Sequence, residues 1–205
     1  MVLLMGEILV SNESSFYEKV FTENLQDRKI IFNDEVTQNV VEDIVLQIFK
    51  YNKEDKDIPI EKRKPIFLYI NSVGGEIGNG FVIIDAIEAS KTPVYAVVLA
   101  YAYSMGGLLL LAAKKKYAFK NSTILLHDGS MGAVTSGGKF KDIAKFYDTM
   151  GERIKEYVLS NTKMTSEFYD IKYEKEFYMY ADTEAKELGI VDYIIGVDCE
   201  LDEIL

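Results

Sequence analysis

An α/β domain with a largely parallel sheet is the fold that this sequence predicts, because strand-like segments alternate with helix-like ones. Three apolar segments, at residues 66–70, 94–99 and 122–126, have the composition of buried strands. Each of them leads into a short turn that contains glycine, serine or histidine. Sites in parallel sheets gather at the carboxyl ends of strands, so these turns are candidates for a functional site.

The first half of the chain predicts one more strand and two helices. Residues 29–32 (Lys-Ile-Ile-Phe) are typical of a short strand. Apolar residues recur at helical spacing over residues 37–51 and again over 77–87, which predicts two helices. Residues 52–65 are charged and contain two prolines, so we interpret them as a surface loop. The apolar residues within 16–21 could form a short helix or a docking segment.

The second half predicts a sharp turn followed by helices. Residues 103–107 turn the chain into an apolar helix that begins at Leu108. After a glycine-rich stretch, residues 139–160 predict one long helix with an aromatic stripe. At 1.5 Å per residue this helix is on the order of 33 Å long, more than a domain of this size covers. We therefore expect it to project and to pack on another subunit.

Composition and charge narrow the functional class. The chain has 205 residues, 48% of them hydrophobic, which is enough for one well-buried domain. Its net charge of -10 argues against a nucleic-acid surface, and we interpret the basic run Lys114 to Lys116 as a solvated helix end. Cys199 is the only cysteine, so no disulfide can form within the chain, and we regard it as incidental. No run of eighteen apolar residues occurs and the apolar start is too short for a signal peptide, so we expect a soluble cytoplasmic protein.

Ser104 allows two interpretations. A serine before a glycine pair is an ordinary helix N-cap. Its hydroxyl would also stand at a helix N-terminus, where negative charge is favoured, and that position suits a nucleophile. The segment is not the G-x-S-x-G elbow of the α/β-hydrolases, because Ala102 stands where the first glycine would be. The local pattern therefore leaves both interpretations open.

The other two turns contain a possible base and a possible oxyanion site. His127 is the only histidine, so it is the one candidate for an imidazole base, although a single histidine is more often structural. Gly74 and Gly75 follow the strand at 66–70, where backbone N–H groups could bind an oxyanion or the pair could simply form a tight turn. Taken together with Ser104, these turns favour an acyl-transfer site.

Four motifs give this constellation a family resemblance. They are Y-I-N-S-V-G-G at 69–75, A-Y-S-M-G at 102–106, L-L-H at 125–127 and E-A-K-E-L-G-I-V-D at 184–192. In the same order they resemble Y-I-N-S-P-G-G, A-A-S-M-G, M-I-H-Q-P and E-A-x-E-Y-G-L-I/V-D, the motifs typical of the proteolytic subunit of the Clp protease. The likeness extends from about residue 29 to residue 195.

The resemblance implies a fold and a division of the chain. The fold would be the ClpP/crotonase-like ββα superhelix with a projecting handle helix. Residues 1–28 would be an N-terminal segment for axial loops or docking, and residues 29–196 the peptidase domain. The handle would be residues 129–160 within that domain, and residues 197–205 would be a C-terminal tail.

The resemblance also implies roles for the residues of the turns. It places the nucleophile on Ser104, the base on His127 and the backbone oxyanion donors on Gly75 and Met105. It assigns substrate binding to Gly74 and to Gly132 and Ala133, whose strand would pair with an extended peptide.

The acid departs from the family pattern. Glu176, in E-K-E-F-Y-M, falls where the family has the triad aspartate in D-R-D-F-F-M. A glutamate can also orient histidine, and Asp170, Asp182 and Asp128 are alternative acids. Val73 replaces the proline of the family's oxyanion turn, and Asp128 with Gly129 replaces Gln-Pro after the histidine.

The function that the resemblance implies is a serine endopeptidase that degrades unfolded polypeptides inside a barrel. The barrel would be a homo-tetradecamer of two heptamers, fed by a hexameric AAA+ unfoldase that uses the ATP. No metal or organic cofactor is implied for this subunit. Because of Glu176 and Val73, a catalytically weak or inactive structural ring subunit is an alternative. The oxyanion turns also allow a crotonase-like acyl-CoA enzyme. A Ser–Lys peptidase is a further alternative, though one without support from a membrane segment.

Overall fold

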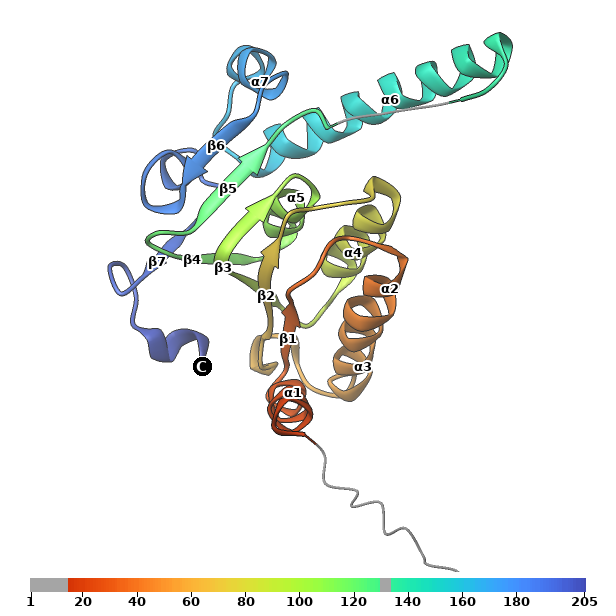
Figure 1. Cartoon of the computed structure of the whole chain (residues 1–205). Coiled ribbons are helices and arrows are strands. Elements are labelled where there is room, and N and C mark those ends of the chain that lie inside the picture. The colour runs from red at the N-terminus through yellow and green to blue at the C-terminus, as the bar shows by residue number, and fades with distance from the viewer. Residues whose placement is uncertain (1–14, 130–133) are drawn as a thin grey trace, which may run out of the picture.

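The computed structural model describes residues 15–129 and 134–205, and within these ranges seven strands form one sheet (Figure 1). The strands are β1 (Lys29–Phe32), β2 (Ile66–Ser72), β3 (Val94–Tyr103), β4 (Lys115–Phe119), β5 (Thr123–Leu126), β6 (Phe177–Tyr180) and β7 (Tyr193–Ile195). The main path runs β1-β2-β3-β4-β7 with parallel pairing throughout. β5 is parallel to the second half of β3, and β6 is antiparallel to β5. The predicted α/β fold with a largely parallel sheet is confirmed.

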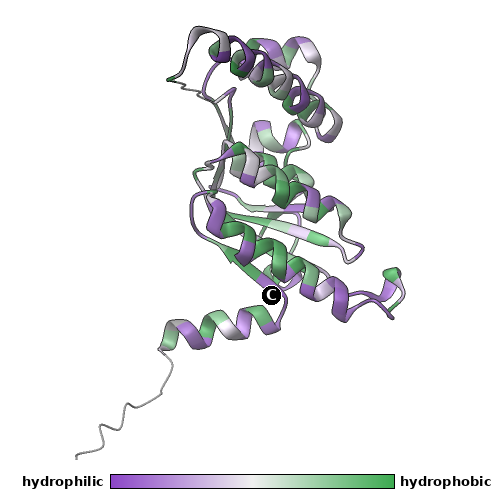
Figure 2. Cartoon of the chain, turned by 90° about the vertical axis from the view of Figure 1, so that its right-hand side faces the viewer, coloured by the Kyte–Doolittle hydropathy of each residue, from purple (hydrophilic) through white to green (hydrophobic). Residues whose placement is uncertain are grey.

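Helices pack mainly on one face of this sheet (Figures 1 and 2). They are α1 (Phe16–Gln26), α2 (Gln38–Val40), α3 (Leu46–Glu54), α4 (Ile77–Ala89), α5 (Met105–Ala112), α6 (Gly137–Asn161) and α7 (Ser166–Tyr173). Shorter turns are η1 (Val41–Val45), η2 (Ile60–Lys62), η3 (Ala181–Ala185) and η4 (Leu201–Ile204). The predicted helix at 37–51 is confirmed as α2, the π-helical η1 and α3 in succession, and the one at 77–87 as α4. Buried Ile, Val and Leu side chains fill the space between these helices and the sheet.

The opposite face of the sheet holds a smaller, aromatic cluster. Tyr69, Tyr95 and Tyr117 pack there with Phe67. The C-terminal η4 covers part of this face, and the Tyr69 hydroxyl donates to the carbonyl of Ile204. No helix in the described ranges is both long and apolar enough to span a bilayer.

The lysine run at 114–116 is not a solvated helix end, and that interpretation is wrong. Lys115 and Lys116 belong to β4, which lies between β3 and β7. Lys116 binds Asp192 through its backbone N–H at 2.9 Å and its ammonium at 3.5 Å. The Lys115 ammonium lies 5.1 Å from the centre of the Tyr95 ring. The long aliphatic stems let both lysines occupy a strand while their ammonium groups reach partners. A pattern of hydropathy therefore does not predict this strand.

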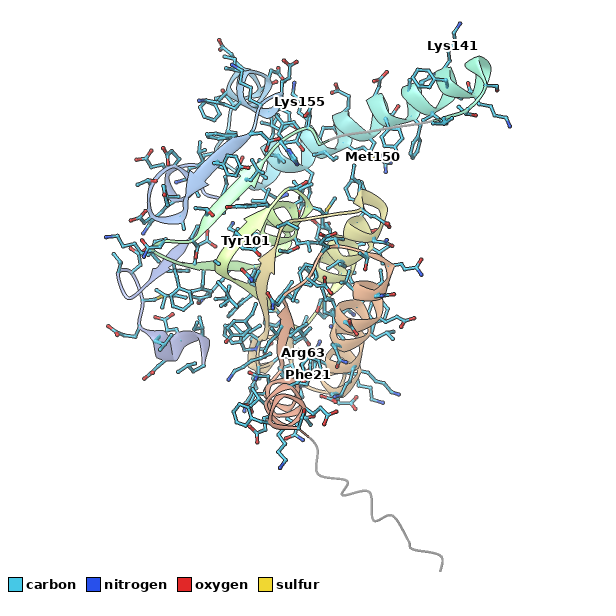
Figure 3. All side chains as sticks on the ribbon, viewed as in Figure 1. Phe21, Arg63, Tyr101, Lys141, Met150 and Lys155 are labelled. Carbon is cyan, nitrogen blue, oxygen red and sulfur yellow. The ribbon has the colours of Figure 1, made fainter. Side chains whose placement is uncertain are left out.

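The long helix α6 projects from the body, as the sequence predicts (Figure 1). Its last turns are anchored, because Ile154 and Val158 are buried and the Tyr157 hydroxyl donates to the Leu108 carbonyl at 3.1 Å. Its other end carries exposed aromatic side chains, which are Phe140, Phe146 and Tyr147. Figure 3 shows Lys141 near the far end of the helix and Met150 closer to the body.

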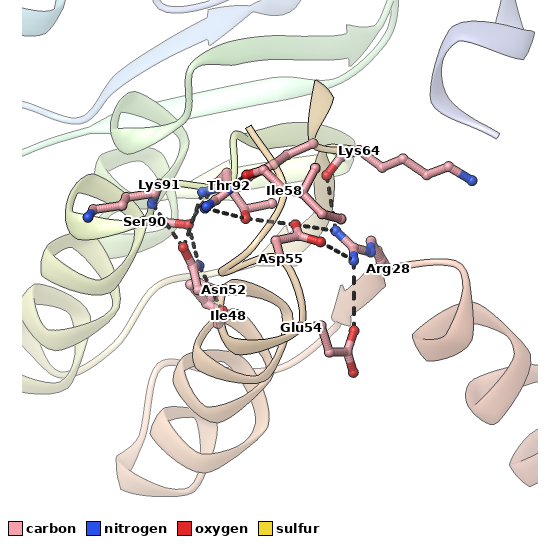
Figure 4. A network of polar contacts seen from close by, with 11 residues as sticks. Arg28, Ile48, Asn52, Glu54, Asp55, Ile58, Lys64, Ser90, Lys91 and Thr92 are labelled. Atoms are coloured by element: carbon pink, nitrogen blue, oxygen red, sulfur yellow. Dashed lines mark hydrogen bonds and ion pairs between the residues drawn. The ribbon is translucent and has the colours of Figure 1, made fainter. Parts of the chain in front are cut away.

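A polar network fastens the start of the sheet to the helical layer (Figure 4). Arg28, in the left-handed conformation at φ 61°, donates to both oxygens of Asp55 at 2.6 and 2.7 Å. Asp55 also accepts from the Thr92 hydroxyl at 2.8 Å. The Asn52 side chain accepts from the backbone N–H groups of Lys91 and Thr92. The hydrogen bonds from Arg28 hold the pKa of the Asp55 carboxyl below its usual value, despite its burial.

Candidate active site

The parallel register brings the three candidate turns together. Ser72 of β2 is level with Ala102 of β3, and Tyr103 is level with Leu125 of β5. The residues that follow these strands therefore meet at one edge of the sheet. They line a cavity of about 250 Å³. Its polar members are Ser104, His127, Asp128 and Tyr173, and its apolar wall includes Ile77, Leu108, Leu126 and Ile154.

Ser104 occupies a strained turn between β3 and α5. Its φ of 53° and ψ of -121° are unusual for a residue with a side chain, and such strain is typical of functional positions. The turn is held by its backbone, because the Ser104 N–H donates to the Leu125 carbonyl at 2.9 Å. The serine precedes α5 directly, but its hydroxyl makes no capping hydrogen bond. The capping interpretation therefore does not account for this side chain.

The Gly74-Gly75 turn packs directly against the serine turn. Both glycines have positive φ, at 96° and 147°. A Cβ on Gly74 would lie 2.6 Å from the Tyr103 carbonyl oxygen and 2.9 Å from the Met105 nitrogen. Within the described residues neither the N–H of Gly75 nor that of Met105 has a protein acceptor. These two donors, beside a strained serine, form a candidate oxyanion site.

Val36 completes this turn, and the sequence did not point to it. The Val36 N–H donates to the Gly74 carbonyl at 2.7 Å, and its carbonyl accepts from Glu76 at 2.8 Å. A Cβ on Gly75 would lie 2.4 Å from the Val36 carbonyl oxygen, so only glycine allows this approach. Nothing in the sequence marks Val36, because its contribution is made by the backbone.

His127 is oriented by Glu176. The Glu176 carboxylate accepts from His127 Nδ1, with 3.0 Å between Oε1 and Nδ1. The other nitrogen, Nε2, is buried and has no hydrogen-bond partner within the described residues. Among the residues that the structure describes, no hydrogen bond joins the Ser104 hydroxyl to His127, although both residues line the cavity. Such catalytic bonds often form only when substrate closes the site.

The alternative acids have other surroundings. Asp170 on α7 pairs with the Lys155 ammonium at 2.5 Å. Asp182 lies on η3, beyond β6. Asp128 lines the cavity, and its backbone N–H donates to the Tyr173 carbonyl at 2.8 Å. Of the four carboxylates, Glu176 is the one that hydrogen-bonds His127.

Tyr173 is a cavity residue that sequence reasoning missed. Its ring stacks on that of Tyr169, with 4.2 Å between the ring centres. Burial raises the pKa of Tyr173 to about 12, so it stays neutral at physiological pH. Gly132 and Ala133, assigned to substrate binding by resemblance, lie outside the described residues. Within the described residues no group of three His, Cys, Asp or Glu side chains could hold a metal ion.

Comparison with known proteins agrees with the motifs. Residues 12–198 match a family model described as Clp protease. The ATP-dependent Clp protease proteolytic subunit 1 of Bacillus cereus is 32% identical over 178 residues, which are 86% of this chain and 89% of that protein. Subunit 2 of Bacillus licheniformis is 30% identical over 178 residues, 86% of this chain and 90% of that protein. Subunit 2 of Treponema pallidum is 28% identical over 193 residues, 93% and 92% of the two chains.

Proposed function

Because this chain belongs to the Clp protease family, we propose that it is an active serine endopeptidase subunit that cleaves unfolded polypeptides. The observation that carries the proposal is the state of His127. Its Nδ1 is engaged by Glu176, while its Nε2 is buried and has no hydrogen-bond partner among residues 15–129 and 134–205, and the residue lines the same cavity as Ser104. This is the arrangement that a general base requires before substrate arrives.

The reaction follows from these groups. Ser104 Oγ bonds to the scissile carbonyl carbon while its proton passes to His127 Nε2. The N–H groups of Gly75 and Met105 stabilise the oxyanion, and Glu176 stabilises the imidazolium. The peptide C–N bond then breaks as His127 returns the proton to the leaving amine. A water then attacks the acyl carbon while its proton passes to His127. The ester bond to Ser104 breaks, the peptide acid leaves, and His127 returns the proton to Ser104 Oγ.

The proposal extends to the assembly. The exposed aromatic end of α6 is a surface that a second copy of this chain could bury, which supports a double ring of two heptamers. The curated relatives are named as subunits of an ATP-dependent protease, and so we assign the ATP-dependent step to a hexameric AAA+ unfoldase. We propose no metal or organic cofactor for this subunit and a cytoplasmic location.

A second candidate function is an inactive ring subunit. The absence of a Ser104–His127 hydrogen bond within the described residues favours it, as does the replacement of the family's proline by Val73. Conversely, His127 Nε2 is buried and has no hydrogen-bond partner in the described part of the chain, which favours the active enzyme.

A fluorophosphonate probe separates the two functions. The purified, sized particle is treated with the probe, and mass spectrometry locates the adduct. Labelling at Ser104 that disappears in Ser104→Ala, with the particle size unchanged, is expected for the peptidase. An assembled particle of about fourteen subunits that excludes the probe would contradict the peptidase and favour the structural subunit.

The acid is tested with two carboxylate variants. Glu176→Ala is expected to lower kcat by roughly 10²- to 10⁴-fold, because the imidazolium loses its partner. Asp170→Ala is the control, since that carboxylate pairs with Lys155 rather than with His127. Full turnover in Glu176→Ala together with its loss in Asp170→Ala would show that the acid is misassigned.

A further inference from the structure

The contacts of the Glu176 side chain do not by themselves hold its carboxylate against His127. Glu176 is 60% exposed, and it directly precedes the four-residue strand β6. In the described sheet β6 pairs with β5 alone. Glutamate also has one more rotatable bond than the aspartate of the family motif, so more conformational freedom must be restricted to hold its carboxylate on His127. What fixes β6 therefore affects the Glu176–His127 distance.

A tyrosine contact ties β6 to the strand that carries the nucleophile. The rings of Tyr178 and Tyr103 meet edge to face, with 5.6 Å between their centres and an interplanar angle of 86°. The two residues share one row of the sheet, on either side of Leu125. Tyr103 is the last residue before Ser104, and Tyr178 is two residues after Glu176.

Tyr103 is itself held firmly. Its ring stacks on Tyr101 at 5.1 Å between ring centres, and its hydroxyl shares a 2.7 Å hydrogen bond with the Thr123 hydroxyl. Tyr101 lies on β3 in the body of the sheet (Figure 3). The contact with Tyr178 thus joins the edge strand β6 to β3, which pairs with three other strands.

The other face of β6 is also covered. Phe177 packs against Phe168 of α7 at 5.7 Å between ring centres, and the Lys172 ammonium lies 5.1 Å from the Phe177 ring centre. Side chains alternate between the two faces of a strand, so Phe177 and Tyr178 make these contacts on opposite faces of β6. Both contacts lie within two residues of Glu176.

We propose that the Tyr103–Tyr178 contact is a brace that positions Glu176 against His127, a role that rests on the proposed peptidase function. The family motif has alanine where this chain has Tyr103, and aspartate where it has Glu176. This chain therefore has both the aromatic contact and the longer acid. Tyr178 is a positioning residue, because it acts through Glu176 and touches no reacting atom.

The test uses three variants of one strand in the assembled protein. Tyr178→Ala removes the ring, and is expected to lower kcat about 3- to 10-fold at unchanged KM, the range of an edge-to-face aromatic pair. Tyr178→Phe keeps the ring and is expected to retain most of the activity, since no hydrogen bond of the Tyr178 hydroxyl exists within the described residues. Tyr180→Ala is the control: Tyr180 is as exposed as Tyr178, 58% against 57%, and its ring makes no aromatic contact in the described chain.

A double variant distinguishes positioning from general destabilisation. In a Glu176→Ala background, Tyr178→Ala is expected to cause no further loss of kcat, because the group that it positions is gone. If Tyr178→Ala assembles poorly, Tyr178→Leu replaces it as a ring-free variant that keeps apolar bulk. An equal loss in both backgrounds, or equal effects of Tyr178→Ala and Tyr180→Ala, would overturn the brace.

A spectroscopic readout keeps the brace separate from the peptidase proposal. His127 is the only histidine, so ¹⁵N-histidine labelling gives one imidazole whose shifts report which nitrogen carries the proton. Magic-angle-spinning NMR is expected to find the proton on Nδ1 in the native protein and in Tyr178→Phe, and a larger Nε2–H fraction in Tyr178→Ala. An inactive native protein with this pattern would refute the peptidase and support the brace. An active protein in which the His127 tautomer is the same with and without the Tyr178 ring would refute the brace alone.

Discussion

Replacing Arg28 with methionine should destabilise the fold by about 3 kcal/mol at pH 7, because it leaves a buried carboxylate without its cation. Arg28 donates to both oxygens of Asp55, a residue that is 1% exposed. Methionine keeps much of the aliphatic stem and removes the charge and the donors. The Thr92 hydroxyl, 2.8 Å from Asp55, remains as a donor. The loss in free energy of unfolding is therefore expected at the lower end of the range for a buried ion pair that loses one partner.

The pH dependence of this loss has a definite sign. In the native protein the folded-state pKa of Asp55 lies below its unfolded value, so its contribution is complete above the unfolded pKa of about 4 and is lost as the pH falls through the folded pKa. Without Arg28, burial raises the folded-state pKa of Asp55, so the variant gains stability as the pH falls. The difference between the two proteins should therefore shrink to about 1 kcal/mol near pH 4, where the variant carboxyl is protonated.

The measurement is urea denaturation followed by circular dichroism, since the chain has no tryptophan. Protein concentration is held fixed, because assembly adds to apparent stability. Lys56→Met is the matched control: the Lys56 ammonium lies 3.9 Å from the Asp57 carboxylate, both side chains are exposed, and its loss should cost under about 1 kcal/mol. A loss below 1 kcal/mol for Arg28→Met, or one that is constant from pH 7 to pH 4, would refute the reasoning.

Three further predictions follow from glycine packing, burial and helix anchoring. Gly74→Ala should lower kcat by about 100-fold or more in a peptide assay, because its Cβ would displace the serine turn, whereas Gly78→Ala, with open space around its Cβ, should leave kcat near the native value. Cys199 should react with a disulfide reagent at pH 8 far more slowly than in urea-unfolded protein, because burial raises the pKa of its thiol; equal rates would contradict its burial. Tyr157→Phe should cost about 1 kcal/mol in urea denaturation through its lost hydrogen bond to Leu108, and an unchanged midpoint would show that this bond does not anchor α6.

Sequence reasoning worked where a residue acts through its own neighbours in the chain. Strand ends and turns are local patterns, so the positions of Gly74, Ser104 and His127 at the carboxyl ends of strands could be predicted. It failed where partners from distant segments supply the environment. β4 was missed because Lys115 and Lys116 are charged, and their partners Tyr95 and Asp192 come from other strands.

The α/β class, the three turns of the site and the family motifs can be predicted from the order of the amino acids, because periodicity and turn composition are properties of adjacent residues. The carboxylate that meets His127 cannot be identified in this way, because the hydrogen bond joins residues 49 positions apart and depends on tertiary packing. Tertiary packing also determines that Ser104 is strained rather than capping, and that Val36 closes the glycine turn. These features depend on how strands align across the sheet, and strand register is a property of long-range packing.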